Sequence, residues 1–158
     1  MIYLITGAVN QGKSTHLLGI YRSLQKGDGF YNRKIYHGDC FVGQEIVHLA
    51  TGESRLFAFR DGFIPENWPE ECRYGTFSFS REGLSFGREI IQNALDSNIE
   101  PLFIDEIGPL ELDGKGFSKF LSSLLAASGE IYLVVRESCL ENVVNKFGIT
   151  EYLVFKII

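Results

Sequence analysis

The stretch Ile2-Tyr-Leu-Ile-Thr-Gly-Ala-Val-Asn-Gln-Gly-Lys-Ser14 decides the fold. Its first part, Ile2 to Thr6, is a short apolar run that ends at Gly7, which is typical of a buried strand in a parallel sheet. From Ser14 to Lys26 apolar residues recur at helical spacing, and Gly27 stands where a helix would end. We therefore expect a strand, a glycine-containing loop and a helix in direct succession.

The loop in this stretch, Gly7 to Ser14, matches the pattern G-x-x-x-x-G-K-[ST], in which every fixed position has a physical task. The glycines let backbone N–H groups approach phosphates, and the start of the following helix favours anions. Lys13 is expected to reach the β- and γ-phosphates, and the Ser14 hydroxyl to coordinate Mg²⁺. The alternative is a glycine turn that binds nothing, and the flanking strand and helix argue against it. The predicted phosphate-binding residues are Gly7, Ala8, Val9, Asn10, Gln11, Gly12, Lys13, Ser14 and Thr15.

A second apolar run, Pro101 to Ile104, is followed by the acidic pair Asp105-Glu106. Open α/β sheets bind ligands at the carboxyl ends of their strands, so this pair is expected beside the phosphate loop. Asp105 is suited to hold Mg²⁺ together with Ser14, because Mg²⁺ prefers a few hard oxygen ligands and keeps several waters. Glu106 is placed to orient and deprotonate an attacking water. The sequence thus predicts Glu106 and Lys13 as the catalytic residues and Mg²⁺ as the cofactor.

The rest of the chain predicts an α/β fold. Helical periodicity runs from Gly83 to Ser97 and again from Phe117 to Leu125, and Ile131 to Val135 is a further apolar strand. Ser138-Cys-Leu-Glu141 has the capping-box pattern that opens a helix, and residues 152–158 form a last strand. Strands that alternate with helices imply a mostly parallel sheet flanked by helices.

The stretch from Gly29 to Ser80 has a different pattern. Ile46–Leu49 and Leu56–Phe59 flank a turn and indicate a β-hairpin, and Tyr74–Phe79 is another strand candidate after an irregular loop. Trp68 in that loop either stacks on a base or packs locally, and packing is favoured. We expect one domain over residues 1–158, with residues 29–80 as a β-rich elaboration, because 158 residues is near the usual size of a single domain.

Composition excludes several classes of protein. The formal net charge of −5 argues against a nucleic-acid partner, because the phosphate backbone attracts a basic surface. The sequence has no apolar stretch long enough to span a membrane and no signal peptide, so a cytoplasmic location without a membrane partner is expected. Cys40, Cys72 and Cys139 lack the spacing of a zinc site or a disulfide framework, and the three histidines show no ligand-like spacing. The oligomeric state is left open.

With these motifs in place, the chain resembles the small thermophile-type nucleoside-triphosphatase family, P-loop enzymes with a RecA-like α/β core. The most specific match is Asp105-Glu-Ile-Gly-Pro-Leu-Glu-Leu112, which is similar to that family's D-E-I-G-x-x-E-L segment. Other likenesses are the P-loop, the Gly29-Phe-Tyr31 turn, the hairpin around Gly43 and Thr51-Gly-Glu53, and the strand that ends in Arg136. The family usually has a basic residue where this chain has Pro109.

The resemblance implies hydrolysis of a nucleoside triphosphate, ATP, GTP or another, to the diphosphate and phosphate with broad base tolerance. It implies phosphate binding by Gly7 through Thr15, Mg²⁺ at Ser14 and Asp105, water activation by Glu106, and support of the site by Glu111.

Two other functions stay open at this point. A nucleotide or small-molecule kinase would use the same loop but would need a second substrate pocket, and a nucleotide-dependent binding switch would retain its product. Arg136 follows a strand, so it is either a cation for the γ-phosphate or a member of a surface ion pair. Lys115 and Lys119 are weaker candidates, because a solvated helix face explains them.

Overall fold

The computed structural model describes residues 1–8, 12–127 and 129–158. In chain order its elements are β1 (Ile2–Gly7), α1 (Lys13–Leu24), β2 (Asp28–His37), β3 (Cys40–His48), β4 (Ser54–Arg60), β5 (Glu70–Tyr74), β6 (Phe77–Ser80), α2 (Arg81–Asp96), β7 (Leu102–Ile107), α3 (Pro109–Leu112), α4 (Ser118–Ala126), β8 (Ile131–Val135), the 3₁₀ turn η1 (Glu137–Cys139), α5 (Leu140–Lys146) and β9 (Tyr152–Ile157).

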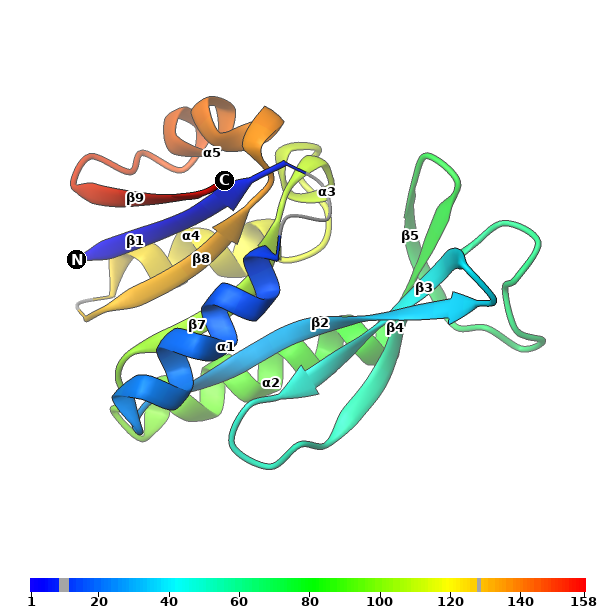
Figure 1. The fold of residues 1–158 in the computed structure, drawn as a ribbon, viewed down its shortest axis with the longest axis horizontal. Helices are drawn as coiled ribbons and strands as arrows, with labels where there is room; N and C mark the ends of the chain where they lie inside the picture. Colours follow the sequence, from blue (N-terminus) through cyan, green and yellow to red (C-terminus); the bar gives the residue numbers. More distant parts are fainter. Residues whose placement is uncertain (9–11, 128) are drawn as a thin grey trace.

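The strands form a nine-stranded sheet in the order β5-β6-β4-β3-β2-β7-β8-β1-β9 (Figure 1). Strands β2, β7, β8, β1 and β9 pair in parallel, with Ile2 of β1 opposite Ile131 of β8. Strands β2 to β6 pair antiparallel and extend away from the parallel part as a wing, defined here as residues 31–80 (Figure 1). The predicted α/β class with a β-rich elaboration is therefore confirmed.

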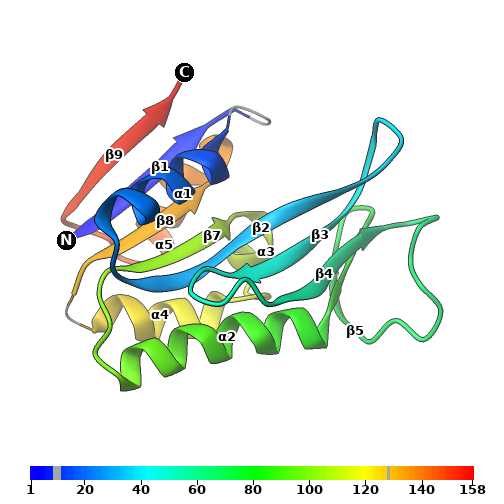
Figure 2. The same cartoon turned by 60° about the horizontal axis from the view of Figure 1, so that its bottom comes forward.

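Helices cover both faces of the parallel strands (Figure 2). On one face α1 inserts Leu17 among Ile5, Phe103 and Val134. On the other face α2, α4 and α5 pack over the larger core, to which Leu4 and Ile104 contribute. Alternate residues of each central strand thus enter opposite cores, as expected for parallel strands buried on both sides. In the described ranges, no helix is long and apolar enough to cross a membrane.

The residues Gly29-Phe-Tyr31, expected as a turn, instead continue β2 alongside β7. The close approach of the two strands explains the glycine. A Cβ on Gly29 would lie 1.9 Å from the carbonyl oxygen of Phe103, and its φ of 152° is one that other residues rarely adopt. The glycine that suggested a turn therefore permits strand pairing.

The expected strand Tyr74–Phe79 is two strands, because Gly75 turns the chain with a φ of 58° between β5 and β6. The capping box expected at Ser138–Glu141 is also absent from this segment, since no side chain caps α5 and Ser138 lies inside the preceding 3₁₀ turn. Trp68 packs edge-on against Phe59, which confirms local packing of the loop.

Candidate active site

The phosphate loop joins the end of β1 to the start of α1. Gly12 adopts a φ of 77°, and Lys13 is buried with its Nζ donating to the carbonyl oxygens of Gly7 at 3.2 Å and Ala8 at 3.1 Å. Of the predicted phosphate-binding residues, Val9, Asn10 and Gln11 lie outside the described residues. The described part of the loop thus places the Lys13 ammonium at the carboxyl end of β1.

Ser14 and Asp105, the two residues expected at the metal, lie in direct contact. The Ser14 hydroxyl donates a hydrogen bond of 2.5 Å to Oδ2 of Asp105. Ser14 stands in the first turn of α1, and Asp105 near the carboxyl end of β7. The backbone N–H of Asn32, on β2, donates to the same Asp105 oxygen across 3.1 Å. Three elements therefore meet at one carboxylate.

The surroundings of the Asp105 carboxyl disfavour its ionised form. Burial raises its pKa to about 7, and the nearby charge of Glu106 adds to the rise. Hydrogen bonds from Ser14 and Asn32, together with the charge of Lys13, act in the opposite direction. A cation bound next to this buried carboxyl would stabilise its ionised form.

The donor set at Asp105 fits Mg²⁺. A hydroxyl and a carboxylate are hard oxygen ligands, and the Oδ1 atom of Asn32 is buried without a hydrogen-bond partner in the described residues. An unpaired buried acceptor needs a donor, and a water of a hydrated cation is one. Within the same residues there is no group of three His, Cys, Asp or Glu side chains that could hold a metal, so a zinc-type cluster is not formed there.

Glu106 and Arg136 face each other beside the phosphate loop. Arg136 Nη2 lies 3.6 Å from Glu106 Oε1, and 25% of the Glu106 side chain is exposed. Both residues line a cavity of about 530 Å³ with the start of α1. The P-loop cavity, as we call it, is lined by Gly12, Lys13, Ser14, Thr15, Leu18, Tyr31, Asn32, Arg33, Lys34, Tyr36, Phe41, Gln44, Glu106 and Arg136. Arg136 thus forms the ion pair that the sequence allowed, and it does so at the P-loop cavity, where a role toward the γ-phosphate stays a prediction.

Glu111 is buried next to the site without touching Ser14 or Asp105. Its Oε1 accepts from the backbone N–H of Gly108 at 2.9 Å, and its Oε2 accepts from that of Phe117 at 3.1 Å. Burial raises the pKa of this carboxyl to about 7, against the lowering effect of these hydrogen bonds. Glu111 thus fixes the segment that follows Glu106.

Sequence reasoning missed the contribution of β2 and β3 to the site. Asn32, Tyr36 and Gln44 line the P-loop cavity but match no motif. The aromatic and branched residues Phe30, Tyr31, Ile35 and Tyr36 were the available signal for a strand here. Lys115 and Lys119 do not line this cavity, and Lys115 pairs with Asp113 instead.

Comparison with known proteins identifies a family and relatives that this chain matches in sequence. A family model described as NTPase matches residues 2–157. The nucleoside-triphosphatase THEP1 of Natranaerobius thermophilus is 33% identical over 127 residues, which are 79% of this chain and 69% of the relative. THEP1 of Methanocaldococcus jannaschii is 30% identical over 154 residues, 93% of this chain and 82% of the relative.

The fold also matches a solved structure. The crystal structure of THEP1 from the hyperthermophile Aquifex aeolicus has a TM-score of 0.77 and 17% identity, over 99% of this chain and 90% of that one. This likeness extends through the parallel strands and the wing. The chain therefore belongs to the NTPase family of nucleoside-triphosphatase enzymes.

Proposed function

We propose that the protein hydrolyses nucleoside triphosphates to the diphosphate and phosphate in a Mg²⁺-dependent reaction with broad base tolerance. The observation that supports this most is the 2.5 Å contact between Ser14 and Asp105 beside the phosphate loop. Glu106, the next residue, offers a carboxylate to a water without itself being required as the metal's ligand.

The residues of the site divide the tasks of this reaction. Lys13 binds the β- and γ-phosphates and stabilises the charge that develops on them. Ser14 and Asp105 would hold Mg²⁺, which supplies neutralisation of phosphate charge when bound. Glu106 orients the attacking water and accepts its proton, and Arg136 holds the Glu106 carboxylate and adds positive charge near the γ-phosphate.

Base tolerance is supported by the aromatic wall of the P-loop cavity. Tyr31, Tyr36 and Phe41 line it on the side of β2 and β3. Stacking on an aromatic ring accepts every base, because each base presents a π face. We therefore place the base against this wall, where affinity depends little on base identity.

The test measures phosphate release from ATP, GTP, CTP and UTP with Mg²⁺ and with EDTA. We expect release from all four nucleotides and none with EDTA. Glu106→Gln should lower turnover by about 10²- to 10⁴-fold while nucleotide still binds, since the proton acceptor is removed and the phosphate-binding residues remain. Lys13→Ala should weaken both binding and turnover.

Glu141→Gln, an exposed glutamate on α5, is the matched control and should turn over like the wild type. Binding without turnover in the wild type would contradict hydrolysis and favour a switch. Full turnover by Glu106→Gln would remove Glu106 from the proposed role and leave the P-loop assignment standing.

A further inference from the structure

A second cavity, of about 280 Å³, lies on the wing side of Glu106. We call it the wing cavity. The P-loop residues from Gly12 to Thr15 do not line it; strands of the wing, the β5–β6 turn and the segment after β7 do. Its aromatic walls are the side chains of Phe41, Phe57, Tyr74, Phe77 and Phe79.

The wing cavity and the P-loop cavity share one wall. Asn32, Phe41, Gln44, Glu106 and Arg136 line both of them. The carboxylate proposed to accept a proton is therefore reachable from the nucleotide side and from the wing side. A molecule in the wing cavity would therefore meet the Glu106 carboxylate.

The wing cavity is larger than the space that the single attacking water of hydrolysis needs. A cavity of roughly 10–15 Å³ is enough for one water, and an apolar cavity of about 150 Å³ in another protein holds benzene. Space of about 280 Å³ lined by aromatic side chains thus suits one or two rings better than a single water.

The wing cavity also offers polar groups at the shared wall. The side chains of Gln44 and Thr76 line the cavity. An aromatic molecule with a hydroxyl or a ring nitrogen would find hydrogen-bond partners there, in addition to stacking.

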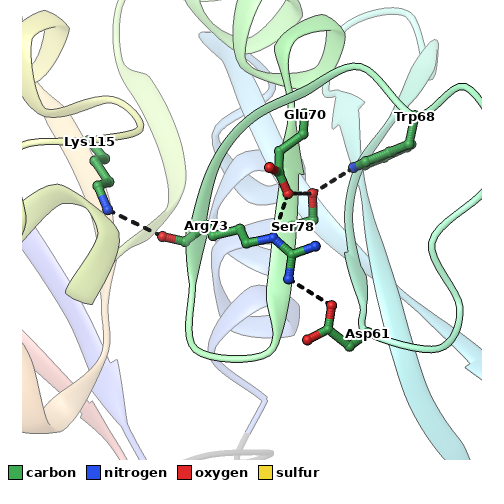
Figure 3. A network of polar contacts seen from close by, with 6 residues as sticks. All are labelled: Asp61, Trp68, Glu70, Arg73, Ser78 and Lys115. Atoms are coloured by element: carbon green, nitrogen blue, oxygen red, sulfur yellow. Dashed lines mark hydrogen bonds and ion pairs between the residues drawn. The ribbon is translucent and has the colours of Figure 1, made fainter.

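The hairpin of β5 and β6, whose turn lines the wing cavity and forms its rim, is held in place by a polar network (Figure 3). Ser78 donates to Glu70 and accepts from Trp68 Nε1 at 3.0 Å. Arg73 bridges Glu70 and Asp61, each at 2.7 Å. These contacts tie β5, β6 and the preceding loop together around the turn that closes the cavity.

A contact from the segment after α3 completes this network. Lys115 Nζ donates to the backbone carbonyl of Arg73 at 3.4 Å, so the rim is attached to the parallel part of the molecule (Figure 3). A rim that is already ordered lowers the entropic cost of binding. These contacts hold the turn between β5 and β6 at the edge of the wing cavity.

We propose that the wing cavity binds a small aromatic alcohol and that the alcohol, in place of water, takes the γ-phosphoryl group. The alcohol oxygen forms the new bond to the γ-phosphorus, the bond from that phosphorus to the β–γ bridging oxygen breaks, and the nucleoside diphosphate leaves. The hydroxyl proton passes to Glu106. This inference rests on the proposed function, because it uses the same Lys13, Ser14 and Glu106.

The test supplies benzyl alcohol, phenylethanol or pyridoxine with Mg²⁺ and ATP labelled at the γ-phosphate, and measures phosphate ester, free phosphate and ADP together. Ethanol and glycerol at equal concentration are the alcohols without an aromatic ring. A bound, oriented hydroxyl has a high effective concentration, so at least one aromatic alcohol should yield about tenfold more ester than glycerol.

A substitution in the wing cavity then tests whether ester formation depends on that cavity. Thr76→Trp fills the wing cavity from an exposed turn and leaves the residues of the P-loop cavity unchanged. Ester formation should fall to the glycerol level, with folding checked by thermal unfolding and ATP binding. Glu66→Trp, in the exposed loop before β5, is the matched control and should keep the ester.

The outcomes separate this inference from the proposed function. If ADP and free phosphate form normally but no aromatic alcohol gives more ester than glycerol, the acceptor role is wrong and hydrolysis stands. An aromatic alcohol that inhibits phosphate release without gaining phosphate would also overturn it. Absence of ADP formation under every condition would overturn both.

Discussion

The backbone N–H of Asn32 donates to Oδ2 of Asp105, the oxygen that also accepts from Ser14. Asn32 lies on β2, the strand shared by the parallel sheet and the wing. The wing is thus joined to the candidate metal site by a main-chain hydrogen bond. Movement of β2 would therefore change the position of the Asp105 carboxylate.

Asp105→Asn should separate metal binding from folding. The amide keeps the size of the side chain but removes the charge that would attract Mg²⁺. Loss of an outer-shell partner alone costs about 10- to 100-fold in metal affinity, so loss of a direct ligand should raise the Mg²⁺ requirement at least as much. The measurement is the rise in thermal midpoint on addition of ATP with increasing Mg²⁺.

The control for this variant is Asp113→Asn, an exposed aspartate paired with Lys115. Its response to Mg²⁺ and ATP should equal that of the wild type. Without Mg²⁺, Asp105→Asn should unfold no earlier than the wild type, because burial disfavours the carboxylate that it replaces. An unchanged Mg²⁺ response in Asp105→Asn would remove Asp105 from the metal site.

The two sides of the candidate site differ in how far sequence could predict them. Ser14 and Asp105 each belong to a local pattern, a glycine loop before a helix and an acidic pair after a strand, so their meeting at one sheet edge was predictable. Asn32 belongs to no such pattern. Its contact depends on the register that sets Phe30 opposite Ile104, a long-range pairing that no single segment specifies.

The fold shows the same division between local and long-range information. Ile131–Val135 was predicted at its observed bounds because a run of apolar residues is a local signal. The turn that the family resemblance implied at Gly29 was wrong, since this glycine permits a close approach to Phe103 on another strand. Local sequence patterns therefore predict where helices and strands lie along the chain. The arrangement of the strands in the wing depends on pairing between distant segments.

Glu111 should make stability depend on pH. Its pKa is raised from 4.5 in the unfolded chain to about 7 in the fold, so the stability linked to its protonated form is full below pH 4.5 and is lost as pH rises through 7. Between pH 5 and pH 8 this group should lower the free energy of unfolding by on the order of 2 kcal/mol. Urea denaturation across that range measures the loss.

Glu111→Gln isolates the contribution of this carboxyl. Asp105 and the other acids remain in both proteins, so the difference between the two pH profiles belongs to position 111. The variant should lose one of the two N–H acceptors and be less stable at pH 5, and the gap should narrow by pH 8. Parallel profiles would show that Glu111 does not titrate in this range.

Arg136→Ala should test whether the guanidinium acts on the reaction. If it stabilises charge near the γ-phosphate, kcat should fall by about 10²- to 10³-fold while ATP affinity changes less. Arg88→Ala removes an ion pair of similar exposure, with Glu71, and lines neither cavity, so its kcat should stay at the wild-type value. A kcat unchanged in Arg136→Ala would leave Arg136 as a surface ion pair only.

Gly29→Ala and Gly19→Ala should change stability in opposite directions. A Cβ at position 29 would collide with the Phe103 backbone and take a strained φ, so β2 must separate from β7 and withdraw Asn32 from Asp105. We expect the free energy of unfolding to fall by more than about 2 kcal/mol, as for other strained backbone substitutions.

Gly19 lies within α1 with nothing within 4 Å of its added Cβ, so alanine should stabilise that helix by about 0.5–1 kcal/mol. Thermal unfolding of both variants measures the difference, and equal midpoints would mean that β2 is free to shift along β7 without cost.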